Sequence, residues 1–271
     1  MSLIKFLDQF NDEEFSSEAR DKFLCRKDAL GKMTDFSKKL ALAAIPFGAF
    51  TALSTPAQAQ STEDLVGVLN FALTLEHLEN EYYILGVNQS GLIPNQREAD
   101  IFEQIRKHEQ QHVDFLIDTV DSLGGTPVEK PTFDFTVGGA FDPFNNYDQF
   151  LALSQAFEDT GVRAYKGQAP AVQGNAQILT AALSIHSVEA RHASEVRRLR
   201  GLKGWITQDN RGAGMPEATQ AAYDGEDQTV QLGIEVTSVT DVGSDGVSEA
   251  WDEILTMQEV LDIASLIIVS E

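Results

Sequence analysis

The stretches Glu109-Gln-Gln-His112 and Glu189-Ala-Arg-His192 repeat one pattern 80 residues apart: a glutamate followed three positions later by a histidine. Each stretch lies in a segment whose apolar residues recur with helical spacing. Positions i and i+3 share one helix face, so each pair can offer a carboxylate and an imidazole to a metal ion. Two more glutamates, Glu76 and Glu158, lie on the apolar stripes of two other predicted helices. The pattern predicts a dinuclear metal site inside a four-helix bundle.

Four helices are expected from this periodicity, over residues 61–86, 95–123, 147–167 and 175–201. Ser61, with acidic residues behind it, opens the first helix, and Gly124-Gly125 closes the second. Short loops join the first pair and the last pair, as antiparallel neighbours require. About 22 residues rich in Gly, Pro and Phe separate the second helix from the third, which is typical of bundles with one long crossover. We therefore predict an all-α fold: a four-helix bundle over residues 61–201, with one long crossover between helices two and three.

Residues 1–60 are expected to form an N-terminal extension or an export signal. Lys38-Lys39 precede the apolar stretch 40–53, and Ala57-Gln-Ala59 supplies a small-x-small end with cleavage after Ala59. About 37 residues precede the apolar core, and Arg26-Lys27 matches a twin-arginine motif only in part. A helix packed on the bundle is the alternative. The export interpretation predicts a periplasmic or exported protein, and the alternative a cytoplasmic one.

Residues 202–271 are expected to form a C-terminal extension packed on the bundle. Residues 229–236 alternate in part between apolar and polar and predict a short strand or hairpin. Residues 248–265 predict one short helix, which leads into the apolar tail 266–269. No second domain is predicted there.

Composition excludes several functional classes. The chain has 42 acidic and 20 basic residues and a net charge of −22, which repels nucleic acid and anionic membrane surfaces and attracts cations. A single cysteine, Cys25, excludes an intramolecular disulfide and a cysteine-rich zinc site. Because no run of 18 apolar residues occurs, we expect no membrane span.

Burial of four glutamates would be costly without compensation. An ionised carboxylate in a dry interior costs many kcal/mol unless it is paired, and four together repel one another. Two divalent cations would balance four carboxylates, and two neutral imidazoles would complete the ligand shell. Oxygen and imidazole ligands without a thiolate favour iron or manganese, although zinc is not excluded. The predicted ligands are Glu76, Glu109, His112, Glu158, Glu189 and His192.

Neighbouring polar residues admit two interpretations. Glu79, one turn from Glu76, could replace it as a ligand or support it. The matched seven-residue spacings from Glu76 to Tyr83 and from Glu158 to Tyr165 favour Glu76. Both tyrosines are either core aromatics or hydrogen-bond donors to a ligand.

The remaining histidines are expected to lie outside the ligand set. His186 shares the Glu189 face and is a rim or core histidine, with ligation as the alternative. His77 and His108 fall off the ligand faces and are predicted to face solvent.

Five segments of the sequence together resemble a known family. They are Leu69-Asn-Phe-Ala-Leu-Thr-Leu-Glu76-His-Leu-Glu79-Asn-Glu-Tyr-Tyr83, His108-Glu-Gln-Gln-His-Val-Asp-Phe-Leu116, Phe157-Glu-Asp-Thr-Gly-Val-Arg-Ala-Tyr165, Ser187-Val-Glu-Ala-Arg-His192 and Trp251-Asp-Glu-Ile-Leu-Thr-Met-Gln-Glu-Val260. The chain resembles the ferritin-like superfamily, and more narrowly its branch of desiccation-related proteins of plants and bacteria. The resemblance covers residues 61–270. It implies two iron or manganese ions per chain, held by the six predicted ligands, but no particular reaction.

The leading functional hypothesis is a di-iron, ferroxidase-like oxidoreductase that reacts with O₂ or peroxide in oxidative or desiccation stress. One alternative is manganese catalase-like disproportionation of peroxide. Another is a structural, desiccation-protective protein without turnover. A homo-oligomer is compatible with the sequence, but storage of iron in a hollow shell is disfavoured because the long C-terminal tail would have to fit a closed assembly.

Overall fold

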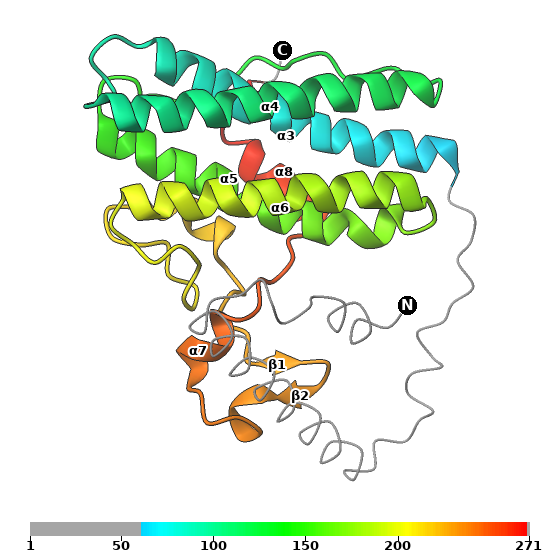
Figure 1. Cartoon of the computed structure of the whole chain (residues 1–271), viewed down its shortest axis with the longest axis vertical. Coiled ribbons are helices and arrows are strands. Elements are labelled where there is room, and N and C mark those ends of the chain that lie inside the picture. The colour runs from blue at the N-terminus through cyan, green and yellow to red at the C-terminus, as the bar shows by residue number, and fades with distance from the viewer. Residues whose placement is uncertain (1–60, 270–271) are drawn as a thin grey trace, which may run out of the picture. The chain divides into compact units, whose positions relative to one another are not determined.

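The computed structural model describes residues 61–269, and Figure 1 shows how its elements are arranged. The N-terminal extension or export signal predicted for residues 1–60 lies outside the described residues. Four long helices dominate: α3 (Thr62–Asn88), α4 (Gln96–Ser122), α5 (Tyr147–Val172) and α6 (Ala176–Leu199). Helix α3 packs along α4, α5 packs along α6, and α3 also contacts α5 (Figure 1). The predicted all-α four-helix bundle with one long crossover is confirmed.

Each long helix begins at a capping side chain. Ser61 and Asp64 form a reciprocal capping box at the start of α3. Asn95, Asn146 and Asn175 accept hydrogen bonds from backbone N–H groups in the first turns of α4, α5 and α6. These residues satisfy donors that have no partner inside the helix, which is why the predicted starts are accurate to about one residue.

The predicted end of the third helix is wrong. We expected α5 to stop near Gly167, but it continues to Val172. A Cβ atom at Gly167 would lie 2.0 Å from the carbonyl oxygen of Leu255. This glycine therefore permits close approach of the C-terminal segment rather than terminating the helix.

The C-terminal extension is mostly irregular, with short elements. They are the 3₁₀-helices η2 (Glu217–Ala222) and η3 (Val236–Ser238), the antiparallel strands β1 (Val230–Gln231) and β2 (Ile234–Glu235), and the helices α7 (Ser244–Ser248) and α8 (Met257–Ala264). A hairpin is thus present within residues 229–236, as predicted. The last part of the C-terminal extension lies against the bundle. Helix α8 packs on α5, and a β-bridge between Phe133 and Ile268 joins the C-terminal tail to the long connection between α4 and α5.

The single helix predicted for residues 248–265 is wrong, because α7 ends where it should begin and α8 starts only at Met257. The backbone between them bonds to α5 instead of to itself. Leu255 donates its N–H to the carbonyl of Arg163, and the carbonyls of Glu253 and Ile254 accept from the Arg163 guanidinium. Thr256 then caps α8 in a capping box with Glu259.

Two apolar clusters occupy opposite ends of the bundle. One is aromatic and includes Tyr82, Tyr83, Phe102 and Phe150. The other is aliphatic and includes Leu69, with leucines and valines of α3, α4 and α5. The predicted ligands lie on the turns between these clusters. None of the described helices combines the length and apolarity needed to cross a membrane.

Candidate metal centre

All six predicted ligand side chains are buried and meet in the middle of the bundle. Helix α3 contributes Glu76, and α5 contributes Glu158, while α4 and α6 each contribute one Glu-x-x-His pair. The four glutamates have no exposed surface. Their donor atoms form two groups, in each of which the atoms lie within 4.8 Å of one another. The groups are Glu76, Glu109, His112 and Glu189, and Glu109, Glu158, Glu189 and His192.

The first group centres on one imidazole nitrogen of α4. The Nδ1 atom of His112 lies 3.1 Å from Oε2 of Glu76, 3.1 Å from Oε2 of Glu109 and 3.1 Å from Oε1 of Glu189. One ring nitrogen carries at most one proton, so it cannot satisfy three carboxylates at once. The convergence of one nitrogen and three oxygens is an arrangement that can hold a metal ion.

The second group is built in the same way around α6. The Nδ1 atom of His192 lies 2.8 Å from Oε1 of Glu109, 3.3 Å from Oε2 of Glu158 and 3.7 Å from Oε2 of Glu189. Glu109 and Glu189 therefore belong to both groups. Each of these two carboxylates turns one oxygen toward His112 and the other toward His192.

Several buried atoms of the cluster lack a hydrogen-bond partner among the described residues. They are Oε1 of Glu109, Oε2 of Glu158, both carboxylate oxygens of Glu189 and Nδ1 of His192. Buried polar atoms are nearly always satisfied, and unsatisfied ones cost free energy. Within the described chain, the ion-pair partners of the four glutamates are only the two histidines. Orphaned oxygen and imidazole donors facing one another fit divalent cations.

The electrostatics of the cluster favour positive charge at both imidazole positions. Burial raises the pKa of Glu109 well above its usual range, and it raises the pKa of Glu158 to about 7. Burial lowers the pKa of His112, but its contacts with three carboxylates outweigh burial and raise that pKa to about 12. Burial also acts to raise the pKa of Glu189, yet its close contacts with the His112 and His192 imidazoles hold that pKa below the usual value. Excess negative charge at this spot attracts cations.

The two repeated tyrosines bond across the bundle rather than to their own helix. Tyr83 of α3 donates to Oε1 of Glu158 on α5, and Tyr165 of α5 donates to Oε1 of Glu76 on α3. The hydroxyls thus hold the carboxylates of Glu158 and Glu76 in place. Of the two interpretations open from sequence, hydrogen bonding to a predicted ligand is confirmed.

The prediction that His77 and His108 face solvent is wrong. His77 is buried. His108 is half-buried, its ring stacks on that of His192 at 5.1 Å, and its Nδ1 atom lies 2.8 Å from Nε2 of His192. Gln104 in turn lies 2.7 Å from the other nitrogen of His108. Sequence periodicity did not predict the contacts from Gln104 through His108 to His192. His108 lies off the face of α4 that carries Glu109 and His112, but its side chain contacts the neighbouring helix α6.

A fifth carboxylate lies beside the cluster. Glu79 is buried but belongs to neither ligand group, whereas Glu76 belongs to one. A Cβ atom at Gly161 would lie 3.1 Å from Oε1 of Glu79 and 3.6 Å from Oε2 of Glu189. The absence of a side chain at Gly161 thus gives Glu79 its room. His186, the other open candidate, is half-buried and also belongs to neither group.

A family model described as the ferritin-like domain matches residues 64–202, which contain the four helices and all six predicted ligands. A search of curated proteins finds no significant match.

Proposed function

Because the chain belongs to the ferritin-like domain family, we propose that its buried cluster holds two metal ions, preferentially iron, and reacts with O₂ or peroxide in oxidative or desiccation stress. One observation carries the proposal. The two ligand groups share Glu109 and Glu189. Each of these carboxylates directs one oxygen toward the first group and its other oxygen toward the second. Two shared carboxylates are what a pair of adjacent cations requires.

The residues divide into bridging and terminal roles. Glu109 and Glu189 would bridge the two ions. Glu76 and His112 would complete one coordination shell, and Glu158 with His192 would complete the other. Four carboxylates neutralise two divalent cations, and a shell of oxygen and imidazole without thiolate favours iron or manganese.

The chemistry divides between the ions and the protein. When bound, the two ions supply redox equivalents and Lewis acidity for the reduction of O₂ or peroxide. The hydroxyls of Tyr83 and Tyr165 hold Glu158 and Glu76 in orientation. His108 orients His192 through its outer nitrogen, a contact that commonly tunes metal-bound imidazoles. At the aromatic end of the bundle, the fully buried rings of Tyr82, Phe102 and Phe150 fill the space beside the cluster.

The test combines metal analysis with oxygen consumption. Protein loaded with Fe²⁺ under anaerobic conditions should hold two ions per chain, as the dinuclear ligand set requires. On exposure to air or peroxide it should consume the oxidant while an absorbance band develops. Glu189→Gln should lose metal and activity, because it removes charge from both groups. Glu195→Gln is the matched control on the same helix, since Glu195 is half-exposed and its ion-pair partner within residues 61–269 is Arg97, away from both ligand groups.

The outcomes separate the parts of the proposal. A protein that binds no metal would overturn the metal centre. One that holds two ions yet consumes neither O₂ nor peroxide would overturn the reaction and favour a structural, stress-protective role. Evolution of O₂ from peroxide by the manganese-loaded protein would instead assign catalase-like disproportionation.

A further inference from the structure

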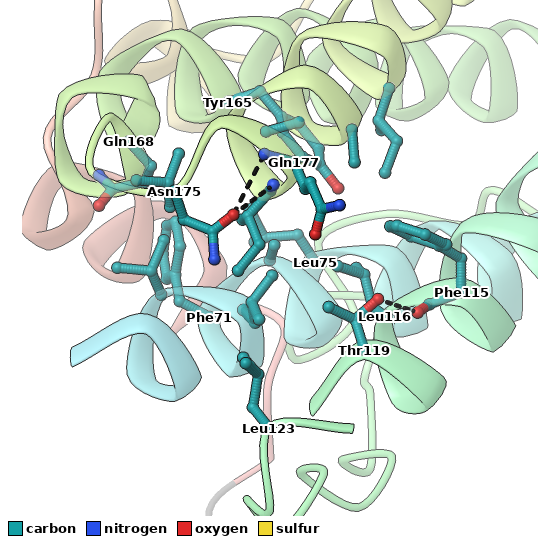
Figure 2. A pocket seen from close by; sticks show the side chains of 18 of the residues that line it. Phe71, Leu75, Phe115, Leu116, Thr119, Leu123, Tyr165, Gln168, Asn175 and Gln177 are labelled. Carbon is teal, nitrogen blue, oxygen red and sulfur yellow. Dashed lines mark hydrogen bonds between the residues drawn. The ribbon is translucent and has the colours of Figure 1, made fainter. Parts of the chain in front are cut away.

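A cavity of about 350 Å³ opens at one end of the bundle (Figure 2). It lies between the N-terminal halves of α3 and α6 and the C-terminal halves of α4 and α5. Its wall is largely apolar, with Phe71, Leu75, Leu116 and Ile185 among the lining residues. The volume is in the range of small-molecule sites, which are typically about 300–1,000 Å³.

The cavity adjoins the metal centre. Tyr165 lines the cavity, and its hydroxyl also donates a hydrogen bond to Glu76. Leu116 follows His112 by one helical turn, and Ile185 precedes Glu189 by one turn. A molecule in the cavity would therefore lie against residues that touch or immediately follow the cluster.

The opposite end of the bundle shows that such a cavity is not a necessary result of the fold. The repeat relates α3 to α5 by 82 positions (Glu76 to Glu158) and α4 to α6 by 80 positions (Glu109 to Glu189). By these offsets, Ala164 at the cavity corresponds to Tyr82, and Ala182 corresponds to Phe102. Both aromatic rings are fully buried and fill the other end. Small residues replace them on the cavity side.

The lining also restricts the charge of the occupant. Apart from Tyr165, none of the lining residues carries an ionisable side chain. A carboxylate or ammonium group would lose its hydration there without gaining an ionic partner. Neutral polar groups gather toward the exposed end, where Thr119, Ser122 and Gln177 line the cavity. Figure 2 shows Gln177 extending from α6 toward Leu75 and Leu116.

We propose that this cavity binds an uncharged, largely hydrocarbon small molecule with a neutral polar end, such as a medium-chain alcohol, aldehyde or amide. The hydrocarbon part packs beside Tyr165, and the polar end meets the amides and hydroxyls at the mouth. Whether the bound molecule takes part in chemistry at the metal centre rests on the proposed function. The binding itself does not.

The test is a displacement titration on the full chain, with and without metal. The neutral dye N-phenylnaphthylamine should fluoresce on binding and be displaced by decanol. Decanoate and decylammonium should compete at least about tenfold less well, because the cavity offers no partner for their charge.

Filling variants locate the site. Ala182→Phe copies the ring of Phe102 and should weaken dye binding by about tenfold or more, since a ring occupies the space of the ligand. Thr119→Phe narrows the mouth of the cavity and should also weaken dye binding. Because Thr119 is half-exposed, the larger side chain does not have to fit into the packed core. Leu183→Phe is the matched control, because Leu183 is exposed on α6 and does not line the cavity. Circular dichroism checks that each variant is folded.

Two results would overturn the inference: no saturable dye binding to the folded chain, or equal binding by wild type, Ala182→Phe and Thr119→Phe. Competition by decanoate as strong as by decanol would overturn the assignment of an uncharged ligand. If the chain binds the dye but takes up no metal when it is loaded with Fe²⁺, the cavity assignment stands, and the failure to take up metal counts only against the proposed function.

Discussion

Glu189 shows most clearly how single side chains define the centre. It is fully buried, both of its oxygens lack hydrogen-bond partners, and it contacts the imidazoles of two different helices. A purely structural glutamate would be expected to accept hydrogen bonds from its surroundings. The tyrosines, by contrast, satisfy one oxygen each on Glu76 and Glu158. The unsatisfied atoms are thus concentrated between the two groups.

The tyrosine hydroxyls should control metal affinity more than folding. We expect Tyr165→Phe or Tyr83→Phe to weaken metal binding about 10- to 100-fold, because each removes the group that orients a ligand carboxylate. Titration against a competing chelator measures this. Tyr223→Phe is the control: its hydroxyl donates to Asp159 at 2.9 Å, away from the cluster, so its loss should cost about 1–3 kcal/mol of stability and no metal affinity. If Tyr165→Phe and Tyr83→Phe both left the metal affinity unchanged, the positioning role of the two tyrosines would be refuted.

Helix α3 is held against α5 by close contact at the aromatic end. A Cβ atom at Gly86 would lie 2.2 Å from the ring of Phe150, which stacks on Tyr82 at 5.0 Å. Gly86→Ala should therefore destabilise the fold by about 1–3 kcal/mol through overpacking. Gly67→Ala in the same helix meets nothing within 4 Å and should stabilise by about 0.5–1 kcal/mol. Denaturant unfolding of both variants measures the difference, and a stabilising Gly86→Ala would contradict the packing argument.

Arg163 ties the C-terminal extension to α5. Its guanidinium pairs with buried Glu226 at 2.8 Å and donates to the carbonyls of Ala222, Asp224 and Glu253. Arg163→Met should cost about 3–5 kcal/mol, because it strands a buried carboxylate and leaves these carbonyls unpaired. Denaturant unfolding gives the magnitude, and limited proteolysis should show earlier cleavage within residues 202–256.

Two further variants test this account of Arg163. Adding Glu226→Gln to Arg163→Met should restore part of the loss, because no charge is then left unpaired. Arg106→Ala removes a partly exposed pair with Glu103 on α4 and should cost less than about 1 kcal/mol. Equal effects of Arg163→Met and Arg106→Ala would contradict the assignment.

The molecule as a whole is organised around its polar centre. The cluster joins side chains of all four helices, so binding of cations there would couple to folding of the entire bundle. A ligand that binds only the folded state at one hundred times its dissociation constant adds about 2.7 kcal/mol of stability. We therefore expect Fe²⁺ or Mn²⁺ to raise the melting temperature and a chelator to lower it. Glu189→Gln should lose this response, and a melting temperature unaffected by metal in the wild type would refute the coupling.

Sequence determined the parts of this protein that depend on local geometry. The Glu-x-x-His pairs share a helix face by the 3.6-residue repeat, and the caps fix where each helix begins. The bundle, its crossover and the six side chains that converge could therefore be predicted. The choice of Glu76 over Glu79 followed from the matched spacing to the tyrosines, and the structure brings Glu76 into a ligand group.

The contacts between side chains of different helices could be found only from the tertiary structure. Which oxygen of Glu109 faces which histidine, and that each tyrosine bonds to the opposite helix, depend on how the helices pack. The end of α5 was mispredicted because Gly167 serves a contact with Leu255, 88 residues later in the chain. Likewise, the small residues that leave a cavity at one end look ordinary in sequence. Contacts between distant segments are set by packing in three dimensions, and a helical period carries no information about them.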